Sequence, residues 1–289
     1  MTGSEFSWWH ALILGVVQGA TEFLPVSSSG HLVLVQSLLG LELPGITFEV
    51  TVHLGTLLAV LAVYRREIWQ MAVAVAAGAG PALTGPRGRR EFWRNPHSRL
   101  FLLVLIGSVP AALLGLLGRR QLALLFTSLN WVAVGWLVTG VLLLLAHRTL
   151  SRRQVPAGAP PAADLDGGRA LWVGLFQGLA LVPGISRSGS TVTAALLAGV
   201  EAAAAARFSF LLAIPAIAGA ALLDGVDVLT GNAPSLPAGP LLVGFAAAAA
   251  SGYLAIRWLL SLLAAGRLLP FALYCWVLAL ITLLVPLGA

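Results

Sequence analysis

The chain has 289 residues, of which 58% are hydrophobic and 10% are charged, whereas a soluble domain typically carries about 25% charged residues. This composition excludes an ordinary soluble protein and indicates a polytopic membrane protein. The formal net charge of +6 comes from seventeen arginines with no lysine, and in a membrane protein such a balance reports orientation, so no nucleic-acid partner is expected.

Residues 7–24 and 26–40 predict two short helices separated by Pro, Gly and Ser residues. Helical pieces too short to span a bilayer suggest a re-entrant helix-loop-helix hairpin that protein must enclose. The hairpin contains QGATEFLPVSSSGHL, which places polar groups at membrane depth, where they are costly and usually functional. Gln18 and Glu22 are four residues apart, so their side chains share one helical face.

The loop of this hairpin predicts an anion site. Pro25 ends the first helix, and the next helix begins near Gly30 and His31, with free N–H groups and a positive dipole end. The hydroxyls that can cap it are those of Ser27, Ser28 and Ser29. Taken alone, a serine run beside Gly and Pro is most often a plain turn, and a single His most often caps or packs.

Six apolar segments have the length of spanning helices, which need ~20 apolar residues. They are residues 47–64, 99–117, 128–147, 205–224, 240–263 and 270–288. Two polar stretches rich in Pro and Gly, residues 78–98 and 151–168, predict loops, and the second joins two halves of the chain.

Three polar residues at the ends of spans each have two interpretations. Glu49 and His53 are four apart at the end of the first span, where they line the mouth of a pocket or simply hydrogen-bond each other. Arg207 lies at the start of the predicted span 205–224. It is expected to face lipid headgroups or to cap the second hairpin rather than to touch substrate.

Residues 169–182 and 189–200 predict a second re-entrant hairpin. It contains QGLALVPGISRSGST, whose Gln-to-Gly distance equals the 12 residues of the first hairpin. The loop adds Arg187, whose guanidinium can hold two phosphate oxygens at once, flanked by Ser186, Ser188 and Gly189. Because polar groups recur at matching places in two repeats, we expect the two loops to form one phosphate pocket.

The predicted fold is therefore a single all-α polytopic membrane domain over residues 1–289. It consists of two repeats, about 1–150 and 169–289, joined by a linker at about 151–168. Each repeat is a re-entrant hairpin plus three transmembrane helices, and the odd number inverts the second repeat. Most loop arginines share one side, which should be cytoplasmic, so the first hairpin and both termini are expected on the external face.

The two hairpin motifs, with FEVTVHLGTLLAV near residue 48 and RFSFLLAIPA near residue 207, resemble the undecaprenyl-diphosphate phosphatase family, also called the bacitracin-resistance family. The resemblance implies an enzyme of the bacterial inner membrane that hydrolyses undecaprenyl diphosphate to the monophosphate. This recycles the lipid carrier for cell-wall synthesis and confers bacitracin resistance. It also implies a divalent cation. The family pattern has Glu or Gln, three residues, then Glu, so Gln18 leaves Glu22 as the only carboxylate of the motif.

The resemblance and the residue chemistry together predict the site. Arg187 neutralises the diphosphate, with Ser27, Ser29, Gly30, Ser186, Ser188 and Gly189 as further substrate ligands. Glu22 and the Gln18 amide bind Mg²⁺ or Ca²⁺. His31 is the expected general acid/base. Ser28 is the candidate nucleophile, and direct attack by water positioned by His31 is the alternative.

Two other classes of function fit part of the pattern. Inverted repeats with broken helices also occur in transporters and lipid flippases, and a non-catalytic lipid-binding protein would leave His31 without a role. The expected partners are a polyprenyl diphosphate and membrane lipids, with a homodimer also possible. The active site is expected to open to the external face of a multi-pass inner-membrane protein.

Overall fold

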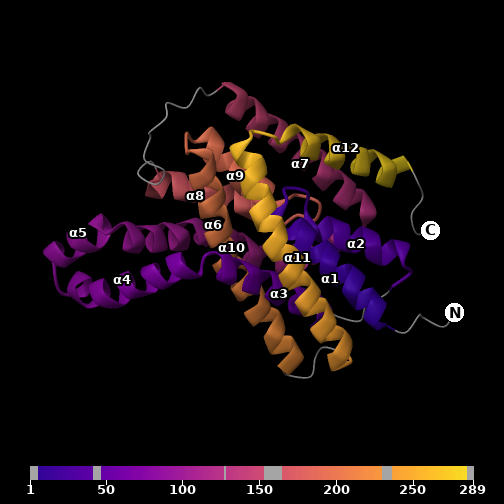
Figure 1. The fold of residues 1–289 in the computed structure, drawn as a ribbon, viewed down its shortest axis with the longest axis horizontal. Coiled ribbons are helices and arrows are strands. Elements are labelled where there is room, and N and C mark those ends of the chain that lie inside the picture. Colours follow the sequence, from indigo (N-terminus) through magenta and orange to yellow (C-terminus); the bar gives the residue numbers. More distant parts are fainter. Residues whose placement is uncertain (1–5, 42–46, 127, 153–164, 230–235, 285–289) are drawn as a thin grey trace.

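The computed structural model describes residues 6–41, 47–126, 128–152, 165–229 and 236–284. Over these residues the chain forms helices and no strands, so the prediction of an all-α protein is confirmed (Figure 1). The helices are α1 (Trp8–Phe23), α2 (Ser28–Leu38), α3 (Thr47–Val63), α4 (Arg65–Thr84), α5 (Pro86–Arg94), α6 (Pro96–Leu125), α7 (Leu129–Arg152), α8 (Gly167–Leu179), α9 (Arg187–Leu197), α10 (Ala202–Leu229), α11 (Ala238–Ala264) and α12 (Leu269–Leu284).

Four of the six predicted spans are helices long and apolar enough to cross a membrane. The qualifying segments lie in α6, α7, α10 and α11 and cover Pro96–Leu122, Leu129–Ser151, Ala202–Leu223 and Ala238–Ala264. The last predicted span is α12, whose described part has 16 residues; residues 285–288 of that prediction lie outside the described residues.

The first predicted span does not form a full-length straight helix. α3 has 17 residues and ends at Val63, and the chain then bends by 79° into α4. The bend falls where Arg65, Arg66 and Glu67 follow the apolar run, because charged side chains are disfavoured in hydrocarbon.

The predicted loop at residues 78–98 was wrong, because most of it is helical. α4 continues to Thr84, and α5 begins at Pro86, which the first turn of a helix accepts because its missing N–H would be unpaired there. The ring of Phe92 packs against Gly78, where an added Cβ would lie 2.7 Å from the ring. Together α4 and α5 form an arm that projects from the body (Figure 1).

Both predicted hairpins are confirmed, as α1 with α2 and α8 with α9. Each packs on a long helix of the other half of the chain through glycines. A Cβ on Gly15 of α1 would lie 2.5 Å from a carbonyl oxygen of α11, and one on Gly174 of α8 would lie 2.2 Å from a carbonyl oxygen of α6. The first hairpin thus packs on a helix of the second half, and the second hairpin on a helix of the first half, as expected for two related halves. Glycine permits the close approach of the helices. The inversion of one half relative to the other stays a prediction.

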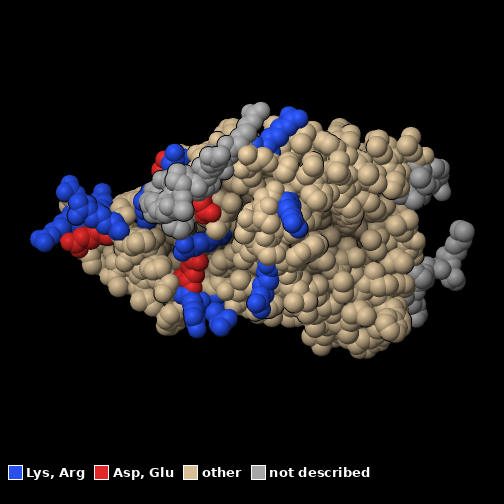
Figure 2. Space-filling model, turned by 45° about the horizontal axis from the view of Figure 1, so that its top comes forward, with Lys and Arg blue, Asp and Glu red and all other residues tan. Residues whose placement is uncertain are grey.

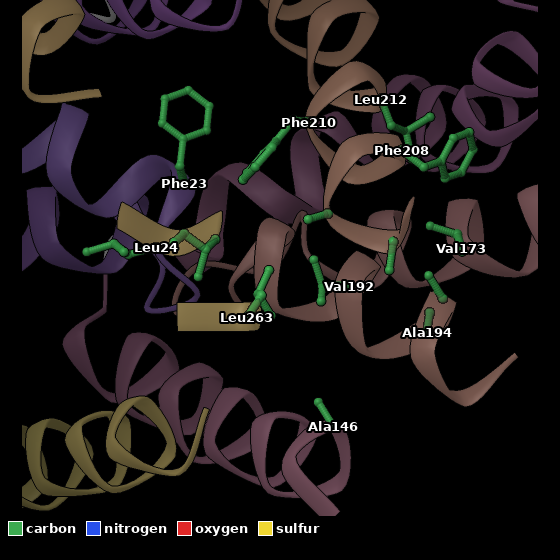
Figure 3. Packing of buried hydrophobic residues seen from close by; sticks show 14 of the residues in the cluster. Phe23, Leu24, Ala146, Val173, Val192, Ala194, Phe208, Phe210, Leu212 and Leu263 are labelled. Carbon is green, nitrogen blue, oxygen red and sulfur yellow. The ribbon is translucent and has the colours of Figure 1, made fainter. Parts of the chain in front are cut away.

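The largest hydrophobic core surrounds the start of α9 and α10 and holds the ends of both hairpins. Phe23, the last residue of α1, meets Phe210 of α10 edge to face, with ring centroids 5.7 Å apart, and both rings are fully buried. Figure 3 shows these rings together with other buried residues of the same core, among them Leu24 and Val192. Glu22, which precedes Phe23, is therefore attached to a rigid point of the fold.

Candidate active site

The loops of the two hairpins touch, as the sequence predicted. Ser188 Oγ donates a hydrogen bond to the carbonyl oxygen of Leu24 over 3.1 Å, and a Cβ on Gly189 would lie 3.3 Å from Pro25 Cβ. Two segments more than 160 residues apart in sequence thus build one site. Their helix ends come together because α1 packs through a glycine on α11 and α8 packs through a glycine on α6.

The same hydrogen bonds form in both loops. In each, the first serine caps the following helix, since its hydroxyl accepts from the amide N–H of a glycine three residues later. The same hydroxyl lies 3.2 Å from that of the serine two residues later. The groups are Ser27, Ser29 and Gly30 in the first loop and Ser186, Ser188 and Gly189 in the second. Of the three serines expected to cap the second helix of the first hairpin, Ser27 is the cap, because α2 begins at Ser28; the cap of α9 is Ser186.

The backbone of the first loop is strained. Ser27 has φ 69° and is the non-glycine residue with positive φ in the described part of the chain. A conformation of this kind costs ~1–3 kcal/mol and is typically found at functional sites. It turns the Ser27 carbonyl oxygen toward the ring of His31, which lies at 2.7 Å.

The carboxylate of Glu22 is the centre of the cluster. Oε2 accepts from Ser28 Oγ over 2.5 Å and from Gln18 Nε2 over 3.0 Å, and Oε1 accepts from an Arg187 NH2 group over 2.6 Å. Glu22 is 8% exposed, so the ion pair with Arg187 lies in a region of low dielectric. Ser28 and Arg187 are the first residues of α2 and α9. The residue of the second half that corresponds to Glu22 is Leu181, which has no carboxylate. The cluster therefore has one carboxylate.

Besides Glu22, the Arg187 side chain has a partner on α10. A second guanidinium nitrogen, NH1, donates to the carbonyl oxygen of Ser209 on α10 over 3.4 Å. The Ser209 hydroxyl in turn lies 2.6 Å from Thr191 Oγ1, which donates to the Arg187 carbonyl oxygen. Sequence reasoning missed Ser209 and Thr191, although Ser209 lies in the quoted segment RFSFLLAIPA. The planar fork of Arg187 thus bridges Glu22 and α10.

Both ring nitrogens of His31 have partners other than this carboxylate. Its Nδ1 donates to the Ser27 carbonyl oxygen, since a carbonyl can only accept, and Nε2 then accepts from the hydroxyl of Tyr274 over 2.7 Å. The ring stacks on Tyr274 with an interplanar angle of 9°, and its edge meets Trp136. Trp136 also donates to the Val26 carbonyl oxygen. Sequence reasoning missed Tyr274, which lies 243 residues from His31.

Two of the residues at span ends have definite partners. His53 of α3 and Glu49 hydrogen-bond each other, which is one of the two alternatives that the sequence left open: His53 Nδ1 donates to the Glu49 backbone carbonyl over 2.7 Å. The other ring nitrogen, Nε2, lies 3.9 Å from Glu22 Oε2. Arg207 forms an ion pair with Glu67 of α4, a partner that the sequence did not predict. That pair joins α10 to the helix after the bend.

The comparison with known proteins identifies the family. The model of the bacitracin resistance protein BacA family matches residues 11–281. The chain belongs to this family. Several relatives are named undecaprenyl-diphosphatase. One from Desulfosudis oleivorans is 47% identical over 95% of this chain and 97% of the relative, and one from Carboxydothermus hydrogenoformans is 42% identical over 96% of each. A third, from Methanobrevibacter smithii, is 41% identical over 94% of this chain and 95% of the relative.

The residues of this family member fit a divalent cation that takes part of its ligands from the substrate. The Oε1 atom of Gln18 is buried without a hydrogen-bond partner, and the Nε2 atom of the same amide donates to the Glu22 carboxylate. An orphaned amide oxygen next to a carboxylate is the kind of oxygen pair that Mg²⁺ or Ca²⁺ accepts. Within the described residues there is no group of three or more His, Cys, Asp or Glu that could hold a metal, so a complete protein cage is not formed there.

Proposed function

We propose that the protein is a membrane phosphatase that hydrolyses undecaprenyl diphosphate to undecaprenyl phosphate and inorganic phosphate, which recycles the lipid carrier of cell-wall synthesis and confers bacitracin resistance. The family membership and the names of the relatives support the substrate. The observation that carries the chemistry is the Glu22 carboxylate, with a serine hydroxyl on one oxygen and an arginine on the other.

The geometry supports Ser28 as the nucleophile and Glu22 as its base. As Ser28 Oγ bonds to the terminal phosphorus, its proton passes to Glu22 Oε2, to which it already donates. The bond from phosphorus to the bridging oxygen breaks and undecaprenyl phosphate leaves. Water then attacks the phosphoserine and both of its protons stay on the inorganic phosphate, released as H₂PO₄⁻, while Ser28 Oγ leaves with the proton from Glu22. A general base positioned in this way typically contributes ~10²–10⁴-fold.

Stabilisation of charge falls to Arg187 and to the two helix starts. The guanidinium can exchange part of its contact with Glu22 for phosphate oxygens. α2 and α9 begin next to the point where the two hairpins touch, and the start of a helix favours an anion. Ser27, Ser29, Gly30, Ser186, Ser188 and Gly189 shape these starts. Phosphoryl transfer is catalysed mainly by positioning and electrostatics, which is what two capped helix ends and one arginine supply.

The role of His31 as general acid/base stays a prediction. Its position in the structure favours a role in holding the backbone next to Ser28. Its ring links the strained Ser27 carbonyl to Tyr274, so it fixes the loop that carries Ser28. Glu22 is the base that contacts the serine hydroxyl.

We further propose that Mg²⁺ or Ca²⁺ is held by Glu22 and the Gln18 amide oxygen together with substrate phosphates. The ion would neutralise phosphate charge. Support comes from the unpartnered Gln18 Oε1 atom.

The proposed location is the bacterial inner membrane, with the active site opening to the external face. Charged side chains gather at and near the α4–α5 arm, whereas the opposite part of the same face is uncharged (Figure 2). α1 begins and α12 ends away from the arm (Figure 1). By the positive-inside rule the arm is cytoplasmic, so a reporter that works only in the cytoplasm, fused after Ala289, should be silent. A strong signal would reverse the orientation. A homodimer stays a prediction, to be checked by mass measurement in detergent.

The activity is tested with purified protein in nanodiscs and undecaprenyl diphosphate, measuring released inorganic phosphate. Wild type should release phosphate, and a rapid acid quench should trap phosphoserine at Ser28. S28A should lose at least ~10²-fold. Activity retained in S28A would establish direct attack by water, and a folded wild-type protein that moves the lipid without releasing phosphate would establish a transporter or flippase instead.

A further inference from the structure

His53 brings an imidazole from a third element to the Glu22 carboxylate. It lies on α3, outside both hairpins, and its side chain is 32% exposed. Its Nδ1 lies 2.7 Å from the Glu49 carbonyl oxygen, and because a carbonyl only accepts, Nδ1 carries the proton. In the neutral ring Nε2 therefore presents a lone pair.

The nitrogen that carries this lone pair lies near a carboxylate oxygen, at a distance that a hydrogen bond does not explain. The separation between His53 Nε2 and Glu22 Oε2 is 3.9 Å, beyond the range of protein hydrogen bonds. Metal bonds to imidazole nitrogen and carboxylate oxygen are each ~2.0–2.2 Å long, so one cation can touch both atoms.

Two neighbouring features fit the same interpretation. An imidazole that binds a metal almost always donates its other N–H to a carbonyl or carboxylate, which fixes the ring, and His53 does so to Glu49. Gln18 Oε1 is buried without a partner, and its amide group is hydrogen-bonded to the same Glu22 oxygen that faces His53.

We propose that His53 Nε2 is a ligand of the divalent cation, together with Glu22 and the Gln18 amide oxygen. An imidazole ligand favours transition metals over Mg²⁺ and Ca²⁺, which prefer oxygen ligands only. The site of this protein therefore accepts Mn²⁺ or Zn²⁺ more tightly than Mg²⁺. This inference rests on the cation of the proposed function and adds a specificity-determining residue to it.

The test uses Mn²⁺, which is paramagnetic, with inorganic phosphate and the full-length protein purified through a tag that contains no histidine. Pulsed EPR of wild type should show ¹⁴N coupling to Mn²⁺, and ¹⁵N labelling of histidine should change it to the ¹⁵N pattern. H53Q should abolish the coupling and weaken Mn²⁺ binding at least tenfold, with a smaller effect on Mg²⁺. H147Q is the matched control, because His147 bonds the Gly266 carbonyl oxygen away from the site, and it should keep the coupling.

The outcomes separate this inference from the proposed function. Wild type that hydrolyses the lipid but shows no nitrogen coupling, or a coupling that survives H53Q, overturns the role of His53 and leaves the phosphatase intact. Wild type that shows a histidine coupling but no hydrolysis overturns the phosphatase and leaves the metal ligand. The isotope-labelled wild-type spectrum decides whether histidine binds the metal even if H53Q fails to fold.

Discussion

The arginine fork of the second hairpin gives the sharpest test of the site. In Arg187→Lys the charge remains but the planar fork is lost. The guanidinium now reaches Glu22 through NH2 and the Ser209 carbonyl oxygen through NH1. A lysine has one terminal nitrogen, and the Glu22 and Ser209 contacts lie on different helices, so we expect it to keep the Glu22 contact and lose the other together with bidentate phosphate binding.

The magnitude follows from the lost hydrogen bonds. A hydrogen bond to a charged group contributes ~1.5–3 kcal/mol, and each 1.4 kcal/mol is about tenfold in rate. Losing one such bond to phosphate in the transition state should reduce kcat/KM by ~10–10²-fold. Because the buried charge stays paired with Glu22, thermal stability in nanodiscs should change little.

The assay is phosphate release over a range of undecaprenyl diphosphate concentrations, with unfolding measured on the same samples. Arg207→Lys is the matched control, because Arg207 pairs with Glu67 rather than with the Glu22 cluster, and its kcat/KM should stay within about threefold of wild type. A wild-type kcat/KM in Arg187→Lys would refute the reasoning, since it would mean that the second hairpin supplies charge alone.

Three further predictions concern the cation, the histidine and the packing. Glu22→Gln should abolish phosphate release or greatly weaken its dependence on the metal, whereas Gln18→Glu, which adds a carboxylate on the same helical face, should keep phosphate release. Tight metal dependence that is unchanged in Glu22→Gln would remove Glu22 from the cation site. Tyr274→Phe keeps the ring stack but removes the hydroxyl from the histidine, so kcat should fall about tenfold with KM unchanged, and equal kcat values in steady-state assays would contradict this. Gly15→Ala places a Cβ 2.5 Å from a carbonyl oxygen of α11 and should lower the free energy of unfolding by ~1–3 kcal/mol. Gly219→Ala is the control, because the space around Gly219 is open, and it should leave thermal unfolding unchanged. Equal melting temperatures for the two variants would contradict the close helix contact.

Local features of the fold could be predicted because they depend on neighbouring residues. Both hairpins, their serine caps and four spans follow from apolar runs interrupted by Pro, Gly and Ser. The helical arm was missed because its composition is that of a loop: α4 contains Pro81, and α5 begins with Pro-Arg-Gly. It is stabilised by packing of Phe92 on Gly78, which no local pattern reports.

By itself, the sequence determined that this is a membrane protein with two related hairpins, which carry Glu22, Ser28 and Arg187 close to their loops. Only the tertiary structure decided which of these groups touch. It placed Ser28 and Arg187 on opposite oxygens of one carboxylate, turned His31 toward Tyr274 and brought His53 to Glu22. The physical reason is that spacing along a helix fixes only which face a side chain occupies, whereas partners from other helices depend on how closely glycine faces allow those helices to pack.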